Sequence, residues 1–187
     1  MRFFLTSISL VLFNVAAFAM EPLKVPYYKQ AHNRYEPSAT CGITSGAMLV
    51  SYFTGKKVTP DNLYEIYGKP QGTTPEGLAK IYRDYGLFAY ATRKGSRAEI
   101  KNHLLSGRVV VVHGWFTSNG HIMPFIGMDD RGFIVNDPAG IWKGCNRCGY
   151  NPGTNGGRVP YSYSSLSSQV LGADGEIWYS VASTANF

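Results

Sequence analysis

The stretch that most constrains the fold is residues 38–53, Ser-Ala-Thr-Cys-Gly-Ile-Thr-Ser-Gly-Ala-Met-Leu-Val-Ser-Tyr-Phe. Its apolar residues recur with helical spacing over three turns, which predicts a buried helix rather than a strand. Thr40 is a good N-cap residue, so we expect the helix to begin at Cys41. A thiol in the first turn lies in the positive field of the helix dipole, which favours the nucleophilic thiolate. The alternative is a core cysteine, because free cysteine is among the most buried residue types.

The first 19 residues have the pattern of a signal peptide. Arg2 supplies a positive charge before a short apolar run, and the Ala-Phe-Ala motif ending at Ala19 fits a cleavage site. A membrane anchor is the alternative, but the run is short and ends in the cleavage motif, and no second long apolar stretch follows. A chain of this length suits one domain. We therefore expect residues 20–187 to form a single domain without an integral membrane segment, in a bacterial periplasm or secreted.

The charge of the chain bears on its partners. The formal net charge is +6, and it becomes +5 when Arg2 is removed with the signal peptide. A basic exported protein is attracted to anionic surfaces such as cell walls or lipid headgroups. No run of Lys and Arg alternates with aromatic residues, so we expect no nucleic-acid partner.

Three cysteines are an odd number for an oxidising compartment. Cys145 and Cys148 are close enough to pair with each other, which leaves Cys41 as the free thiol. The pair has three interpretations: a loop-closing disulfide, half of a zinc site or a redox pair. Zinc needs about four ligands and no second pair is nearby, while the flanking glycines indicate a loop rather than a helix start. The structural disulfide is the preferred interpretation, and we expect no metal or other cofactor.

Capping and turn signals divide the rest of the chain. Helices are predicted after Thr59-Pro60, after Thr74-Pro75 and after the Ser96–Glu99 capping box. The runs with strand character are 87–92, 109–116, 121–128, 132–137 and 176–182, with a loop over 138–160 and a helical turn over 163–171. Helices followed by a mostly antiparallel sheet indicate an α+β fold. Four aromatic residues near the C-terminus are assigned to core and rim: Tyr161, Tyr163, Trp178 and Tyr179.

A thiolate nucleophile needs a base, and the chain has four histidines. We expect His32, in a polar loop, and His103, on the outer side of a helix, to be solvated. His113 lies inside an apolar strand, which favours a core or rim position. His121 begins a strand after a turn, where a side chain can face a cleft.

Asp137 is the candidate partner of His121. If 121–128 and 132–137 form a hairpin, antiparallel pairing brings His121 near Asp137, whose carboxylate would then hold the imidazole and stabilise its cation. The alternative for Asp137 is a turn cap before Pro138. The backbone N–H of Cys41 and the side-chain amide of Gln30 are candidate donors to an oxyanion.

Taken in order, these motifs resemble a known family. Gln30, then Cys41-Gly42 at a helix start, then Gly120-His121, then Val135-Asn136-Asp137-Pro138 are similar to the bacteriocin-processing (double-glycine) peptidase-like branch of papain-like cysteine peptidases. The resemblance runs from about Val25 to Pro138. It implies a papain-like α+β fold, in which an N-terminal helical part carrying the nucleophile helix packs on a C-terminal, mostly antiparallel sheet. It also implies that Cys41 is the nucleophile, His121 the base, Asp137 its orienting group and Gln30 an oxyanion donor.

These expectations define a function with two alternatives. We expect a stand-alone, exported cysteine peptidase that hydrolyses amide bonds through a thioester, acting on cell-wall (peptidoglycan) peptides or on an exported protein. One alternative is a non-catalytic papain-like module that binds a peptide or a partner protein. The other is an acyl transferase that uses the same residues. The sequence makes no prediction of oligomeric state.

Overall fold

The computed structural model describes residues 18–145, 147–170 and 176–187. Residues 1–17 of the predicted signal peptide lie outside this set. In the part of the chain that is described, no helix is long and apolar enough to cross a membrane.

The helices and strands follow one another in a mixed order. The helical segments of the described residues are η1 (Gln30–His32), α1 (Cys41–Thr54), α2 (Pro60–Gln71), α3 (Pro75–Asp84), α4 (Arg97–Leu105) and α5 (Tyr163–Val170). The strands are β1 (Phe88–Gly95), β2 (Val110–Gly114), β3 (His121–Met128), β4 (Gly132–Val135), β5 (Val159–Ser162) and β6 (Ile177–Ser183).

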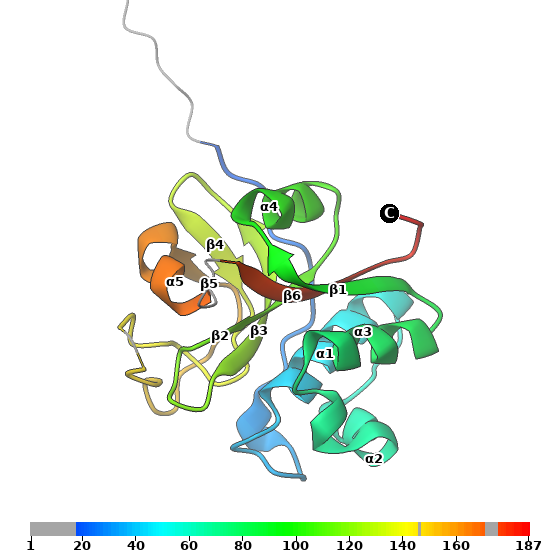
Figure 1. Cartoon of the computed structure of the whole chain (residues 1–187). Helices are drawn as coiled ribbons and strands as arrows, with labels where there is room; N and C mark the ends of the chain where they lie inside the picture. The colour runs from blue at the N-terminus through cyan, green and yellow to red at the C-terminus, as the bar shows by residue number, and fades with distance from the viewer. Residues whose placement is uncertain (1–17, 146, 171–175) are drawn as a thin grey trace, which may run out of the picture.

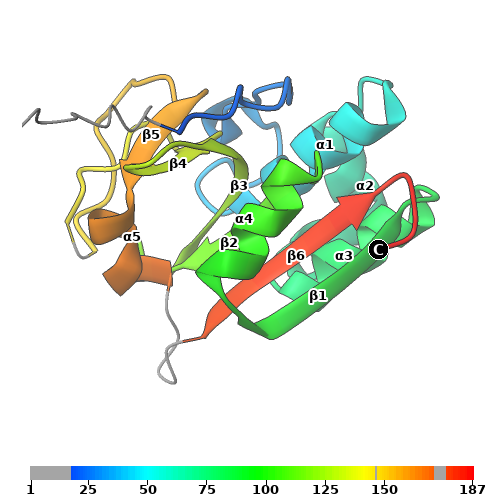
Figure 2. The same cartoon turned by 90° about the horizontal axis from the view of Figure 1, so that it is seen from above.

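The six strands of the described residues form one sheet, with every pair antiparallel and in the order β1-β6-β2-β3-β4-β5 (Figures 1 and 2). The last strand, β6, inserts between β1 and β2, so the sheet is complete only when the C-terminal segment has joined it. Helices on an antiparallel sheet confirm the predicted α+β class.

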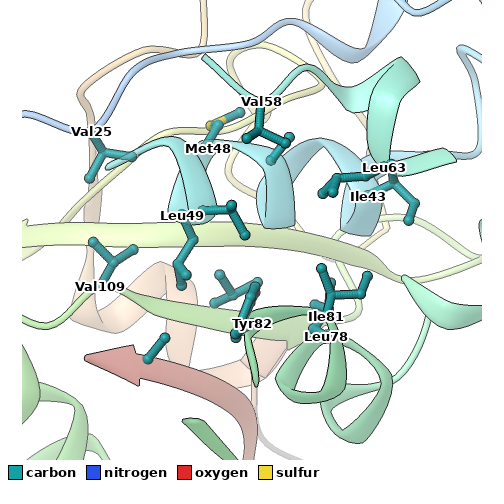
Figure 3. Packing of buried hydrophobic residues seen from close by; sticks show 14 of the residues in the cluster. Val25, Ile43, Met48, Leu49, Val58, Leu63, Leu78, Ile81, Tyr82 and Val109 are labelled. Atoms are coloured by element: carbon teal, nitrogen blue, oxygen red, sulfur yellow. The ribbon is translucent and has the colours of Figure 1, made fainter. Parts of the chain in front are cut away.

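Helices cover both faces of the sheet. On one face α1, α2 and α3 enclose a core that includes Met48, Leu49 and Tyr82, all with no exposed surface (Figure 3). On the other face α4 and α5 pack over a second cluster that includes Ile100 and Leu166. Strand β3 is buried along its whole length because it lies between the two clusters. Full burial of each large apolar side chain contributes about 1.5–3 kcal/mol, which anchors the strand that begins with His121.

Local capping explains where three of the helices begin. Thr59 before α2 and Ser96 before α4 form complete capping boxes with Asn62 and Glu99, and the Thr74 hydroxyl accepts the Gly77 N–H before α3. Each cap satisfies backbone donors that the first turn leaves free. The predicted helix starts are therefore confirmed.

Two expectations from the sequence are wrong. The end of the predicted loop over 138–160 belongs to β5, which pairs with β4; Pro160 is tolerated there because β5 is an edge strand. His103 is buried rather than solvated, and its Nε2 lies 2.8 Å from the Tyr90 hydroxyl. The C-terminal Phe187 also packs against His103 and Tyr90, a long-range contact that the pattern of one helix does not reveal.

The start of α1 is set by a close approach to the end of α2. A Cβ atom added to Gly42 would lie 1.8 Å from the carbonyl oxygen of Gly72, so only glycine fits between the two backbones. At Gly46, in the next turn, an added Cβ would meet the flexible end of Leu78 at 3.2 Å. Gly42, next to Cys41, therefore lets the first turn of α1 pack directly against the end of α2.

These two glycines give a matched test of the packing. Gly42→Ala should lower the free energy of unfolding by about 1–3 kcal/mol, the usual cost of forcing an extra group into a packed site. Gly46→Ala should change it by less than about 1 kcal/mol, because the gain in helix propensity offsets a small shift of Leu78. Urea unfolding of both variants measures the difference, and equal stabilities would contradict the close approach.

Candidate active site

Cys41 is the first residue of α1, a free cysteine in a residue position of intermediate exposure. Thr40 occupies the N-cap position, as predicted, but its hydroxyl makes no cap bond: it donates to the Glu36 carbonyl at 3.1 Å and accepts from the Asn33 amide at 2.9 Å. The expectation of a capping threonine is therefore right in position and wrong in contact. Because the Thr40 side chain does not cap the helix, the Cys41 N–H at its start remains available to an anion.

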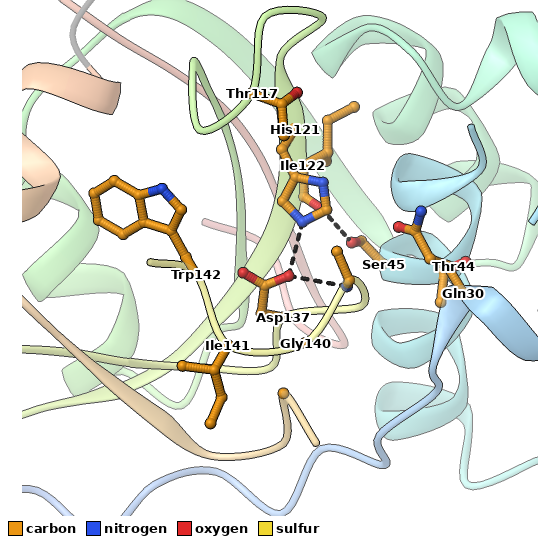
Figure 4. A network of polar contacts seen from close by, with 12 residues as sticks. Gln30, Thr44, Ser45, Thr117, His121, Ile122, Asp137, Gly140, Ile141 and Trp142 are labelled. Carbon is orange, nitrogen blue, oxygen red and sulfur yellow. Dashed lines mark hydrogen bonds and ion pairs between the residues drawn. The ribbon is translucent and has the colours of Figure 1, made fainter. Parts of the chain in front are cut away.

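The elements that carry Cys41 and His121 are joined through the backbone of Ile122. The Ser45 hydroxyl, one turn after Cys41, donates to the Ile122 carbonyl at 3.0 Å (Figure 4). The Ile122 N–H in turn donates to the Cys41 sulfur. The Ser45 hydrogen bond ties α1 to β3 one turn after Cys41, and His121 precedes Ile122 on β3, so the imidazole lies beside the thiol.

His121 is held on its other side by Asp137. The imidazole Nε2 lies 2.8 Å from Asp137 Oδ1 (Figure 4), and both side chains are buried, the carboxylate completely. The Ala139 N–H donates to the same carboxylate oxygen at 3.0 Å. Because Nε2 is directed at Asp137, Nδ1 is the ring nitrogen left for the Cys41 thiol. The β3–β4 hairpin thus gives the predicted proximity of His121 and Asp137.

The charges of Cys41, His121 and Asp137 shift the pKa values of the thiol and the imidazole. Burial raises the pKa of the Cys41 thiol, but the positive charge and hydrogen bond of His121, with the N–H groups of Ile122 and Gly42, outweigh burial and hold that pKa below its usual value. Burial alone would lower the pKa of His121, whereas Asp137 and Cys41 raise it to about 10. Both shifts favour a thiolate beside an imidazolium, the charge state in which a thiol is a nucleophile and an imidazole is an acid.

Gln30 lies beside this group. Its backbone N–H donates to the Pro138 carbonyl at 2.9 Å, which ties η1 to the segment after Asp137. Its side-chain Nε2 donates to the Pro37 carbonyl at 3.1 Å, and its Oε1 is buried without a hydrogen-bond partner. A primary amide has two N–H donors, so one remains for another acceptor. The structure joins Cys41, His121 and Asp137 directly, and holds Gln30 between Pro37 and Pro138.

The other histidines do not join the group. His32 is exposed in η1. Burial lowers the pKa of His113 to about 3, and its Nε2 has no partner, so this ring is neutral and agrees with the predicted core or rim position. Among the described residues, no three His, Cys, Asp or Glu side chains lie close enough to hold a metal ion.

Sequence reasoning missed two tyrosines of the site. The Tyr150 ring lies 5.0 Å from the His121 ring, centroid to centroid. The Tyr161 hydroxyl donates to Asp137 Oδ2 at 3.0 Å. Tyr161 is buried in the core as expected, but its polar contact had no local signal, because it is 24 residues beyond Asp137 and reaches it through the pairing of β4 and β5.

The remaining cysteines form the preferred disulfide. Cys145 and Cys148 are bonded, with their Cα atoms 5.5 Å apart, and they close a loop between Trp142 and Tyr150. The structure therefore confirms the disulfide interpretation and leaves Cys41 as the free thiol.

Comparison with known proteins gives a family and two solved structures of similar fold. Residues 22–169 match the model of the Peptidase_C39 like family. The fold is similar to that of a protein described as a C39-like peptidase from Bacillus anthracis, with a TM-score of 0.62 and 16% identity over 91% of this chain and 100% of that one. It is also similar to a double glycine motif protease from an AMS/PCAT transporter, solved with a leader peptide, with a TM-score of 0.58 and 19% identity over 90% and 98% of the two chains. No curated protein matches the sequence.

The fold and the match over most of the chain define the class as cysteine peptidase. The chain belongs to the Peptidase_C39 like family, which confirms the resemblance drawn from the ordered motifs.

Alkylation of Cys41 by iodoacetamide tests the electrostatics of the site without a substrate. Because the thiol pKa is held below its usual value, the alkylation rate should stay high as the pH is lowered through neutrality. His121→Ala removes the stabilising cation and should move the midpoint of the rate profile to higher pH, whereas His32→Ala should not. A wild-type profile like that of an ordinary exposed thiol would contradict the thiolate–imidazolium state.

Proposed function

We propose that this protein is an exported peptidase that hydrolyses amide bonds through a thioester on Cys41. The observation that carries the proposal is the position of one imidazole, His121, between a thiol and a buried carboxylate. In this mechanism the Cys41 thiolate attacks the carbonyl carbon, and protonated His121 gives its proton to the leaving amine. His121 then removes a proton from water, whose attack on the thioester releases the acid and frees Cys41.

Asp137 and the oxyanion donors complete the proposed mechanism. Asp137 holds His121 in the tautomer that presents Nδ1 to the sulfur and stabilises the imidazolium. The uncapped Cys41 N–H and the second N–H of the Gln30 amide are proposed to bind the oxyanion. The Gln30 amide is held by its hydrogen bond to the Pro37 carbonyl, and the Cys41 N–H is held by the backbone of α1, so little reorganisation accompanies the reaction.

The proposed substrate is a peptide, either a cell-wall peptide or a segment of an exported protein. One structure of similar fold is of a protease solved in complex with a leader peptide, which supports a peptide as the ligand. The net charge of the chain is positive, which favours substrates carried on anionic surfaces.

Export and domain organisation are part of the same proposal. The sequence pattern of residues 1–19 is that of a signal peptide, and the Cys145–Cys148 disulfide suits an oxidising compartment. We propose residues 20–187 as a single domain, since β6, near the C-terminus, lies between β1 and β2.

The nucleophile is tested by substitution of Cys41. The mature protein should release new termini from purified peptidoglycan or from a denatured exported protein, identified by mass spectrometry, and Cys41→Ala should abolish this release while unfolding as cooperatively as the wild type. Cys41→Ala with full activity would exclude the mechanism. Binding without cleavage by the wild type would favour a peptide-binding module, and new amide products in the presence of added amines would favour a transferase.

Gln30→Ala separates oxyanion binding from thiolate formation. Loss of an oxyanion donor should lower kcat on the order of 10²-fold or more. The rate of Cys41 alkylation should change little, because the thiolate is stabilised by His121 rather than by Gln30. Turnover assays give kcat, and alkylation of the same preparation gives the reaction rate of Cys41. An unchanged kcat would remove Gln30 from the mechanism.

A further inference from the structure

The Asp137 carboxylate is held at both oxygens. Oδ1 accepts from His121 Nε2 and from the Ala139 N–H, at 2.8 and 3.0 Å. Oδ2 accepts from the Tyr161 hydroxyl at 3.0 Å. The carboxylate has no exposed surface, so water cannot replace a missing partner. A contact at Oδ2 therefore controls rotation of the whole group, and with it the direction in which Oδ1 faces the imidazole.

The direction of the Tyr161 hydrogen bond follows from its second partner. The Trp142 N–H donates to the Tyr161 oxygen at 2.8 Å, which leaves the phenol proton for an acceptor. Asp137 Oδ2 is the nearer acceptor, since the Gly140 carbonyl lies at 3.4 Å. Burial and the Asp137 charge raise the pKa of Tyr161, so the phenol keeps this proton throughout the working pH range.

The position of the Tyr161 ring is itself fixed by packing. Tyr161 lies on β5 opposite Phe133 of β4, and its ring meets Trp142 edge to face with centroids 5.8 Å apart. Only 6% of the residue is exposed. Because packing fixes the ring, the phenol hydroxyl can hold the Asp137 carboxylate in one orientation and does not move when the carboxylate rotates.

We propose that Tyr161 is a positioning residue of the catalytic group, which locks the Asp137 carboxylate so that His121 Nε2 is held in line with Oδ1. This inference rests on the proposed function, since it assigns to Tyr161 the orientation of the proposed catalytic imidazole. Tyr161 acts through Asp137 and does not reach the reacting atoms.

The test is an NMR spectrum of the full mature protein labelled with 15N-histidine. In the wild type, the Nε2 proton of His121 should give a low-field signal protected from exchange, assigned by its absence in Asp137→Asn. Tyr161→Phe keeps the ring and removes only the hydroxyl, so it should cause loss or an upfield shift of this signal. Tyr163→Phe removes a neighbouring hydroxyl that donates to the Asp129 carbonyl at 2.9 Å, and it should leave the signal unchanged.

The outcomes separate this inference from the proposed function. A wild-type protein without the low-field signal would overturn the His121–Asp137 part of the mechanism. A signal that is present in the wild type and unchanged in Tyr161→Phe would overturn only the role of Tyr161, as would an equal change in Tyr163→Phe. If Tyr161→Phe does not fold, 3-fluorotyrosine at position 161 keeps the ring and strengthens the donor; it should move the His121 signal, and an unmoved signal would contradict the proposal.

The same variants distinguish orientation from binding once a substrate is known. Because Tyr161→Phe removes a hydrogen bond to a charged group, it should lower kcat roughly tenfold or more. KM should stay within about twofold, because Tyr161 does not contact the substrate. A change confined to KM would contradict a positioning role.

Discussion

A carboxylate without any exposed surface, that of Asp137, stands at the centre of the site, and much of the neighbouring structure serves to satisfy its two oxygens. Burying an ion costs several kcal/mol unless its lone pairs are satisfied. Asp137 meets this requirement through His121, the Ala139 N–H and the Tyr161 hydroxyl. Its backbone is fixed as well, since its N–H donates to the Gly156 carbonyl and its carbonyl accepts from the Tyr27 hydroxyl. Segments that are far apart in the sequence therefore converge on one residue.

The second constraint is the contact between α1 and β3. The thiol and the imidazole come from opposite sides of this contact, so their distance depends on the packing of a helix on a sheet rather than on a loop. The Ile122 carbonyl accepts a hydrogen bond from the Ser45 hydroxyl, and the Ile122 N–H helps to lower the pKa of Cys41. Gly42 lets the start of α1 approach the end of α2 closely. Because both core clusters pack on β3, the geometry of the site is supported by a strand that is buried along its whole length.

Much of this arrangement could be predicted from the sequence because it is encoded locally. The threonine and serine caps mark helix starts within four residues, and the hairpin that brings His121 to Asp137 spans a short turn. The disulfide likewise joins residues three apart.

The failures have a common physical cause. Tyr161 and β5 depend on pairing across the sheet, and the burial of His103 depends on Phe187 at the far end of the chain. The Thr40 hydroxyl was predicted to cap α1, yet it bonds the Glu36 carbonyl of the preceding loop. For Tyr161, β5 and His103, a tertiary contact decided the outcome. For Thr40, the hydroxyl had two local partners within reach, and the sequence does not show which one it takes.

The most direct measurement of the central claim is the ionisation of Cys41 and His121 in the resting protein. It can be followed by NMR of 13Cβ-labelled cysteine and 15N-labelled histidine across the pH range. We predict that at neutral pH Cys41 is a thiolate while His121 is an imidazolium, and that His121→Ala returns Cys41 to a neutral thiol. A neutral thiol beside a neutral imidazole at that pH would contradict the account.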